Sequence, residues 1–280
     1  MSIVHFPEYR AYEQDRIRAS DAMMALLAGS RLAENTLRLT DGSTRLLPEI
    51  FPGVTHIRRM NLTTANARSL LAEAEQHLGA MAVPYALAIH EDFVKTCFDL
   101  LIRAGQITPA EVRSTDASSM HRAFENKVGQ RLPNASMEQF QLIRRMRNAV
   151  IHAGGKPKQG LVNAANNLSS SALTQWTKIT GEHPATRVKL GVPVTFSHGE
   201  LILALAVTKR ISQEMNFSLR DSLSRATWAD VALEDFVSEH PQLVHIAQRK
   251  RKLGGFLRSY YQALNLTEPE KSSAIQRARW

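Results

Sequence analysis

The sequence contains a single cysteine, Cys97, among its 280 residues. One cysteine cannot form an intrachain disulfide or build a cysteine-based zinc site. A sequence with a single cysteine is typical of proteins in a reducing compartment. The sequence also lacks an uninterrupted apolar run of about 18 residues, the length expected of a membrane-spanning helix. Its first residues lack the basic-then-apolar order of a secretory signal. We therefore expect a cytoplasmic protein without a membrane span.

Spacings typical of metal sites are also missing. The sequence has ten histidines, but it contains no H-x3-H pair and no H-E-x-x-H pattern; the nearest pairs are His240/His245 and His77/His90. The proline after His240 predicts that this histidine lies at a turn. The glycines form no phosphate-binding loop, and Ser169–Ser171 lack the G-x-S-x-G frame of a serine hydrolase. We expect neither a metal nor another cofactor.

Acidic residues are absent from two segments of a chain whose formal net charge is +9. Both segments are expected to attract polyanions such as RNA, although a merely solvated surface is an equal alternative for the second. Residues 142–160 carry the cations Arg144, Arg145, Arg147, Lys156 and Lys158. Residues 241–265 carry Arg249, Lys250, Arg251, Lys252 and Arg258.

Apolar residues recur with helical periodicity over most of the chain and predict an all-α protein. A small β-hairpin is the exception, because strand-like residues 36–39 and 44–47 flank the turn-forming pair Asp41-Gly42. Residues 154–196 are polar and predict a long loop with at most short elements. Capping patterns predict helix starts at Ser136 and Ser197, and Pro84 is expected near the start of a helix. The predicted helices cover residues 8–29, 63–80, 83–104, 117–130, 136–152, 201–216, 228–239 and 242–264.

These elements predict three parts of the chain. Residues 1–60 form an N-terminal element made of a helix and the hairpin. Residues 61–216 form a helical bundle that includes the long loop. Residues 217–280 form a C-terminal helical extension that carries the second basic segment.

A group of polar side chains lies at the end of the helix predicted over 136–152. Arg144, Asn148 and His152 are four residues apart and share one face, whereas Arg147 is rotated from His152 by about 140°. Histidine exchanges protons near neutral pH, and arginine binds phosphate oxygens through two parallel N–H groups. Together they could cleave RNA without a metal, by attack of the 2′-hydroxyl on the adjacent phosphate. The alternative is structural, since such side chains also satisfy free carbonyls at a helix end.

The segment RNAVIH at residues 147–152, between an amphipathic helix and small residues, resembles the R-x4-H motif of the HEPN superfamily. The predicted helices around it, over residues 61–216, follow a similar order: two long helices, the motif helix, a variable loop and a final capped helix. Glu91 and Lys95 in the second long helix resemble an acidic and basic pair of some members. The predicted loop is long for this family.

The resemblance implies a HEPN-like bundle that forms a homodimer, with two motif helices building one composite, metal-independent ribonuclease site. Arg147 and His152 would carry the reaction, and Asn148 would orient the phosphate or the imidazole. Many relatives are toxins of bacterial toxin–antitoxin pairs or effectors of antiviral defence, so the expected partners are RNA and a cognate antitoxin or defence protein. The substrate would be drawn in by cations of the same segment: Arg144, Arg145, Lys156 and Lys158.

The second basic segment, residues 249–252, is expected to contact RNA or an acidic partner. Phe256 and Tyr260 lie four residues apart and are expected to pack their helix onto the bundle. Two alternatives to a nuclease stay open. A non-catalytic helical module could bind RNA or a partner protein through the same basic surface, or an Arg/His cleft could bind or modify a nucleotide.

Overall fold

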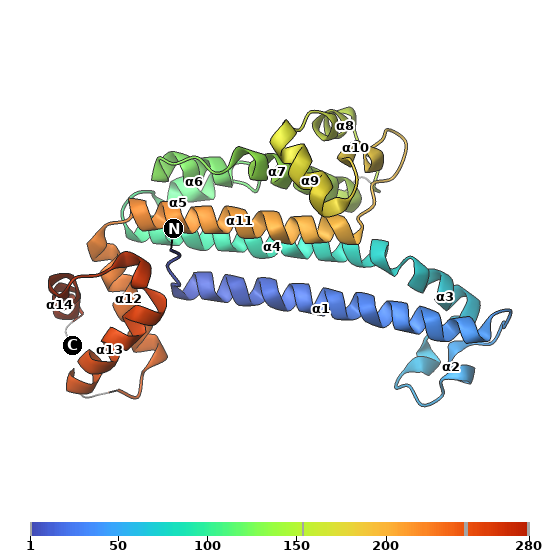
Figure 1. Cartoon of the computed structure of the whole chain (residues 1–280), viewed down its shortest axis with the longest axis horizontal. Helices are drawn as coiled ribbons and strands as arrows, with labels where there is room; N and C mark the ends of the chain where they lie inside the picture. The colour runs from blue at the N-terminus through green and yellow to red at the C-terminus, as the bar shows by residue number, and fades with distance from the viewer. Residues whose placement is uncertain (1, 153, 244–245, 279–280) are drawn as a thin grey trace. The chain divides into compact units, whose positions relative to one another are not determined.

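The computed structural model describes residues 2–152, 154–243 and 246–278, and these form fourteen α-helices and three short 3-10 helices (Figure 1). The all-α prediction is confirmed. Within the described ranges the only β-type pairing is an isolated antiparallel bridge between Leu46 and Thr63. Over the same ranges, no helix combines the length and the apolar character needed to cross a membrane.

The chain forms two compact units. Unit 1 comprises residues 1–16, 87–141 and 206–280, and unit 2 comprises residues 17–86 and 142–205. Four long helices contribute residues to both: α1 (Pro7–Leu37), α4 (Ala74–Arg103), α7 (Asn134–His152) and α11 (His198–Ser222). The shorter helices each belong to one unit.

Unit 1 is built around aromatic side chains. Tyr12 stacks on Phe93 with ring centroids 4.5 Å apart, and Phe6 lies 5.7 Å from Trp228. Such pairs add directional attraction to the burial of apolar area. Three C-terminal helices cluster in this unit (Figure 1). The helices confined to unit 1 are α5 (Pro109–Arg113), α6 (Met120–Val128), α12 (Arg225–Glu239), α13 (Ile246–Tyr260) and α14 (Glu268–Arg277).

A buried ion pair fastens the start of α1 to α12 within unit 1. Arg10 donates to both carboxylate oxygens of Asp235 at 2.8 Å, and the hydroxyl of Tyr261 donates to the same carboxylate at 2.6 Å. Asp235 is 4% exposed, so its charge depends on these donors for compensation. The guanidinium of Arg10 also lies 4.4 Å from the ring centroid of Tyr260.

Two stacked histidines lie in the core of the same unit. The Nε2 atoms of His90 on α4 and His121 on α6 are 2.9 Å apart, and the ring of Phe140 on α7 contacts both imidazoles edge-on. Both histidines are essentially inaccessible to solvent. Burial, reinforced by the neighbouring His121, lowers the pKa of His90 well below its usual value. A hydrogen bond between two neutral rings accounts for this arrangement.

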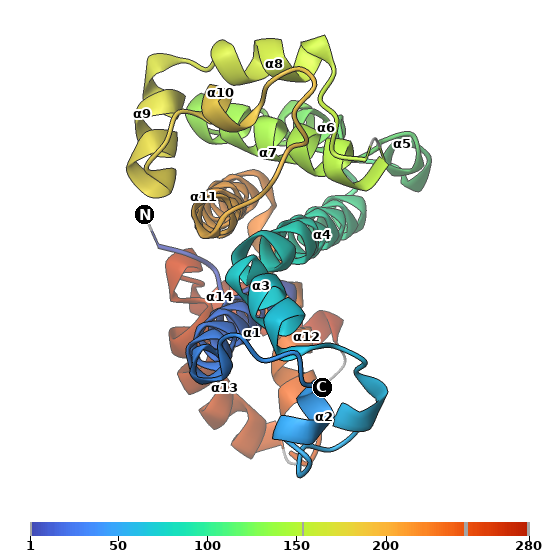
Figure 2. The ribbon, with the colours of Figure 1, turned by 90° about the vertical axis from the view of Figure 1, so that its right-hand side faces the viewer.

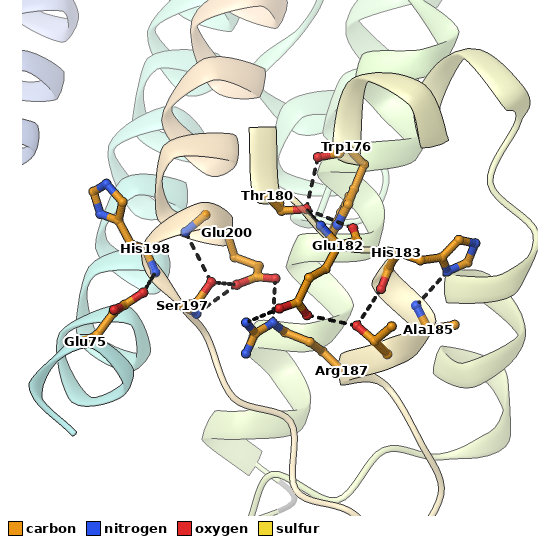
Figure 3. Close-up of polar contacts among 12 residues, drawn as sticks. Glu75, Trp176, Thr180, Glu182, His183, Ala185, Arg187, Ser197, His198 and Glu200 are labelled. Atoms are coloured by element: carbon orange, nitrogen blue, oxygen red, sulfur yellow. Dashed lines mark hydrogen bonds and ion pairs between the residues drawn. The ribbon is translucent and has the colours of Figure 1, made fainter. Parts of the chain in front are cut away.

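Unit 2 gathers short helices beside the C-terminal half of α7, where Figures 1 and 2 both show α8, α9 and α10. Ala172 and Trp176 are fully buried on α9. Arg187 of α10 pairs with Glu200 of α11 at 3.3 Å, and the N–H of His198 donates to Glu75 of α4 at 2.8 Å (Figure 3). The helices confined to unit 2 are α2 (Leu47–Ile50), α3 (Thr64–Ala72), α8 (Gln159–Asn166), α9 (Ser170–Thr180) and α10 (Pro184–Arg187).

The predicted hairpin is wrong. Helix α1 continues to Leu37, and residues 38–40 form a 3-10 helix before the turn at Asp41-Gly42. Leu37 is buried as a helical residue, and the hydroxyl of Thr36 donates to the carbonyl of Leu32 at 2.9 Å inside the helix. Gly42 does adopt a positive φ of 76°, so the turn was predicted correctly although the strands were not.

The segment predicted as a long loop with at most short elements, residues 154–196, contains the three short helices α8, α9 and α10 and is more helical than expected. The physical reason is that the short polar helices of this segment are stabilised by capping hydrogen bonds and by tertiary burial. The hydroxyl of Ser169 accepts from the N–H of Ala172, and Pro184 opens α10 at its first position. Leu161 and Ala165 bury one side of α8.

Several helix boundaries also differ from the prediction. Pro84 lies inside the continuous helix α4, rather than near the start of a separate helix. Ser136 is a buried residue within α7, which already begins at Asn134, so the predicted cap at Ser136 is wrong. The cap at Ser197 is confirmed, because its N–H donates to the carboxylate of Glu200 at 2.8 Å directly before α11. Helix α14 was not predicted.

Gly199 is expected to be needed for the contact between α9 and α11. A Cβ atom added at Gly199 would lie 2.8 Å from the backbone Cα of Thr180. Gly199→Ala should therefore lower the free energy of unfolding by about 1–3 kcal/mol, measured by urea denaturation. Gly29→Ala on α1 is the matched control, because nothing lies within 4 Å of its added Cβ. An unchanged stability of Gly199→Ala would contradict this contact.

The buried histidine pair is expected to make stability fall as the pH falls. The lowered pKa of His90 means that below about pH 6.5 the unfolded chain binds more protons than the folded chain, so unfolding is favoured. The free energy of unfolding should drop by up to about 1.4 kcal/mol per pH unit for each excess proton, as urea curves between about pH 7.5 and 5.5 would show.

The double variant His90→Gln/His121→Gln should reduce this dependence, since amides do not titrate. His77→Gln, at an exposed position on α4, should retain it. A wild-type stability that stays flat over the range would exclude a buried neutral pair.

Candidate anion-binding site on α7 and α8

A pocket of about 450 Å³ lies in unit 2, between the C-terminal half of α7 and the start of α8. Its polar lining comes from α7 and from the segment that follows it. Ala149, Gly160 and Leu161 complete the wall with small or apolar groups. The polar lining residues are Arg145, Asn148, His152, Lys156 and Lys158.

The helical repeat of α7 explains why three of these side chains share the pocket. Positions 145, 148 and 152 follow the spacing that brings residues onto one face of a helix. The opposite face holds the helix in unit 2, because Ile143 and Met146 are fully buried. Arg145 and His152 are both exposed, so their charged or titratable ends reach solvent from a firmly packed helix.

Two glycines turn the chain back after α7. Gly154 and Gly155 have φ values of 56° and 80°, in the left-handed region that favours glycine. The N–H of Gly155 donates to the carbonyl of Ala149 at 2.9 Å, and its carbonyl accepts from Val194 at 2.8 Å. The reversal lets Lys156 and Lys158 line the same pocket as the end of α7.

The pocket has a positive electrostatic character. Arg145, Lys156 and Lys158 carry fixed positive charges, and no carboxylate is among the residues that line the pocket. Gly160 belongs to the first turn of α8, where backbone N–H groups have no acceptor within the helix. Cations and helix-terminal N–H groups both stabilise negative charge, so the pocket is suited to phosphate or another anion.

Asn148 is oriented by its neighbour. The Nη1 of Arg147 donates to Oδ1 of Asn148 at 3.1 Å. Because the side-chain oxygen of Asn148 accepts this bond, its NH2 group is available to donate to a ligand. Arg147 itself is half-buried and is not among the residues that line the pocket. Within one chain it acts on the pocket through Asn148.

The structure brings together five of the residues predicted for this site: Arg145, Asn148, His152, Lys156 and Lys158. Arg144 and Arg147 are half-buried on α7 and do not line the pocket. Sequence reasoning missed Gly160 and Leu161, because their helix was assigned to a loop. The spacing of Leu161 and Ala165, one helical turn apart and both buried, was the signal for α8.

The other predicted residues lie in unit 1. Glu91 is half-buried on α4, and Lys95 is exposed and pairs with Asp92 at 3.8 Å. On α13, Arg249 is half-buried and donates through Nε to the carbonyl of Leu243. The next three residues of the basic segment, Lys250, Arg251 and Lys252, are exposed.

The aromatic side chains of α13 contact α12 and α1, whereas the prediction placed them against the bundle over residues 61–216. Phe256 is 7% exposed and lies 5.5 Å, between ring centroids, from Phe236 of α12. Tyr260 is half-buried and lies under the guanidinium of Arg10. Neither ring is placed to stack on a nucleic-acid base. As predicted, His240 lies where a helix ends, as the C-cap of α12, whereas its nearest histidine in sequence, His245, lies outside the described residues.

Within the part of the chain that the structure describes, no three histidine, cysteine, aspartate or glutamate side chains are grouped to hold a metal ion. A second pocket, of about 480 Å³ in unit 1, contains the carboxylate of Glu125, which pairs with Arg131 at 3.1 Å. The pocket on α7 and α8 is therefore the better anion site. Comparisons of the chain with protein-family models, curated proteins and solved structures find no match.

Inorganic phosphate is expected to bind beside His152. A phosphate titration should shift the imidazole nitrogen resonances of His152, assigned by their loss in His152→Ala. Lys156→Gln/Lys158→Gln should weaken this binding roughly 5–30-fold, since each exposed ion pair contributes about 0.5–1 kcal/mol. Lys178→Gln/Lys209→Gln, which removes two exposed lysines that do not line the pocket, is the control. Equal affinity in both double variants would argue against the site.

Proposed function

We propose that the chain is a metal-independent endoribonuclease of HEPN type, with its reacting site in the pocket of α7 and α8. The observation that carries the proposal is the position of His152. It is an exposed, titratable ring that lines a pocket together with Asn148 and three fixed cations. A proton-transferring group beside a phosphate-binding surface is the minimum that RNA cleavage requires.

The proposed reaction uses the RNA's own 2′-hydroxyl. This oxygen attacks the adjacent phosphorus, its proton passes to the imidazole of His152, and the bond from phosphorus to the 5′-oxygen breaks. The leaving oxygen takes up a proton, so the products are a 2′,3′-cyclic phosphate and a 5′-hydroxyl. Arg145 and the NH2 group of Asn148 stabilise the negative charge that grows on the phosphate. Lys156 and Lys158 hold the neighbouring phosphates.

Arg147 has a positioning role in this proposal when one chain is considered. Its bond to Oδ1 of Asn148 fixes the direction of the amide donors. A homodimer, as the R-x4-H resemblance implies, would allow Arg147 of one copy to approach the phosphate held by the other. Either arrangement suits a bacterial toxin or a defence effector that acts on RNA and is restrained by a partner protein.

RNA cleavage is expected to depend on His152. His152→Ala should lower the cleavage rate of a single-stranded RNA by about 10²–10⁴-fold, because the proton-transferring group is gone. The rate would be measured under single-turnover conditions in the presence of a chelator, with circular dichroism as the check on folding. His77→Ala, another exposed histidine, is the control and should cleave normally.

Equal cleavage by the wild type and His152→Ala would remove the proposal. A second candidate is a non-catalytic RNA-binding module, which is favoured by the absence of Arg147 from the pocket lining. It predicts salt-dependent RNA binding by the wild type with no cleaved product. A third outcome, modification of a mononucleotide with RNA left intact, would indicate a nucleotide-handling enzyme.

A further inference from the structure

Helix α13 has one buried side and one strongly basic side. Leu253, Phe256 and Leu257 are buried and fix the orientation of the helix in unit 1. Arg251 and Arg258 are exposed on the opposite side. Because they are seven residues apart, they differ by only about 20° in direction and by about 10 Å along the helix axis.

The positions between these arginines carry a pair of glycines. Gly254 and Gly255 lie in the interior of α13, where glycine is less stable than alanine. Their φ values are not positive, and nothing lies within 4 Å of a Cβ added at either position. No contact in the described chain therefore requires glycine here. The pair leaves a stretch of bare helix backbone between two outward-pointing arginines.

The charges of this face have no acidic partner among the residues that the structure describes. The exposed cations of α13 are Lys250, Arg251, Lys252 and Arg258. Within residues 2–152, 154–243 and 246–278, no carboxylate forms an ion pair with any of these four side chains. Cations brought together without acids repel one another, and an external polyanion relieves that repulsion.

We propose that this outer face of α13 binds the sugar–phosphate backbone of an RNA strand, which lies across Gly254 and Gly255 between Arg251 and Arg258. Each guanidinium binds a phosphate through two parallel N–H groups. Lys250 and Lys252 supply further contacts on either side. Binding to this surface is independent of the RNA sequence, since phosphate contacts position a strand without identifying its bases. It is separate from the pocket of α7 and α8 and does not depend on the cleavage proposed there.

An RNA strand suits this surface better than an acidic protein helix does. A sugar–phosphate strand carries a charge at every nucleotide and is narrow enough to approach the bare backbone over the glycines. An acidic helix presents its carboxylates on long side chains, and such chains reach arginines equally well over alanine as over glycine. The glycine pair therefore favours a partner that comes close to the backbone itself.

The double variant Gly254→Ala/Gly255→Ala separates this role from a structural one. Two alanines in open space should raise the Tm by roughly 2–6 °C, because alanine is the better helix residue. The same variant should bind RNA several-fold more weakly, because two methyl groups would keep the strand away from the backbone at positions 254 and 255. Binding would be measured by fluorescence anisotropy with a 2′-O-methyl RNA strand of about 20 nucleotides, which cannot be cleaved through a 2′-hydroxyl.

The charges are tested with Arg251→Gln/Arg258→Gln. Losing two phosphate contacts should reduce the magnitude of the slope of log affinity against log salt by about 1.4 and weaken binding roughly 10–30-fold at about 0.1 M salt. The control is Arg45→Gln/Arg113→Gln, which removes two exposed arginines outside α13, one before α2 and one at the end of α5. The control should lose less than twofold.

Unchanged RNA affinity in both α13 variants would overturn the proposal. So would loss of binding to polyglutamate with RNA binding retained, since that result would indicate an acidic protein partner. The outcome is independent of the ribonuclease proposal. If the α13 variants bind RNA weakly but His152→Ala cleaves normally, only the ribonuclease proposal fails. If the α13 variants bind RNA normally while His152→Ala is inactive, only the α13 proposal fails.

Discussion

The candidate site depends on one backbone constraint, the reversal of the chain immediately after α7. Gly154 and Gly155 take left-handed conformations that other residues adopt only at a cost, and the N–H of Gly155 is held by the carbonyl of Ala149. Without this turn, Lys156 and Lys158 would continue away from the helix end. With it, they line one pocket together with His152. A conformational property of two glycines thus decides where two charges lie, and those charges decide which ligands the pocket accepts.

Both basic surfaces are built at a cost to the folded chain, and the cost is electrostatic. Some arginines elsewhere in the molecule are compensated by a carboxylate, as Arg10 is by Asp235 and Arg225 is by Glu270. The pocket of α7 and α8 has no acidic lining residue, and the exposed cations of α13 have no described acidic partner. Proteins keep uncompensated charges of one sign where a ligand of the opposite sign supplies the compensation. The contrast between these regions therefore supports anion binding more strongly than the net charge does.

The sequence allowed the all-α class and the face of α7 that carries Asn148 and His152 to be predicted, because both depend on helical periodicity alone. The hairpin failed because alternating residues at the end of α1 are equally compatible with a helix whose Leu37 is buried. The positions of α8, α9 and α10 within residues 154–196 were not predicted, because short helices are stabilised by tertiary burial, here of Trp176, that periodicity does not reveal. The pocket could be predicted in its residues but not in its shape, since a glycine pair indicates where a helix stops and not the direction of the following chain.

The helical repeat also bears on which arginine can assist His152. A separation of five residues places Arg147 about 140° from His152, whereas a separation of seven places Arg145 only about 20° away. The structure agrees with this arithmetic, because Arg145 lines the pocket with His152 and Arg147 does not. Arg147 and His152 therefore point in different directions from α7. In the proposed cleavage Arg147 would act either from a second copy of the chain or through Asn148, to which it donates a hydrogen bond within one chain.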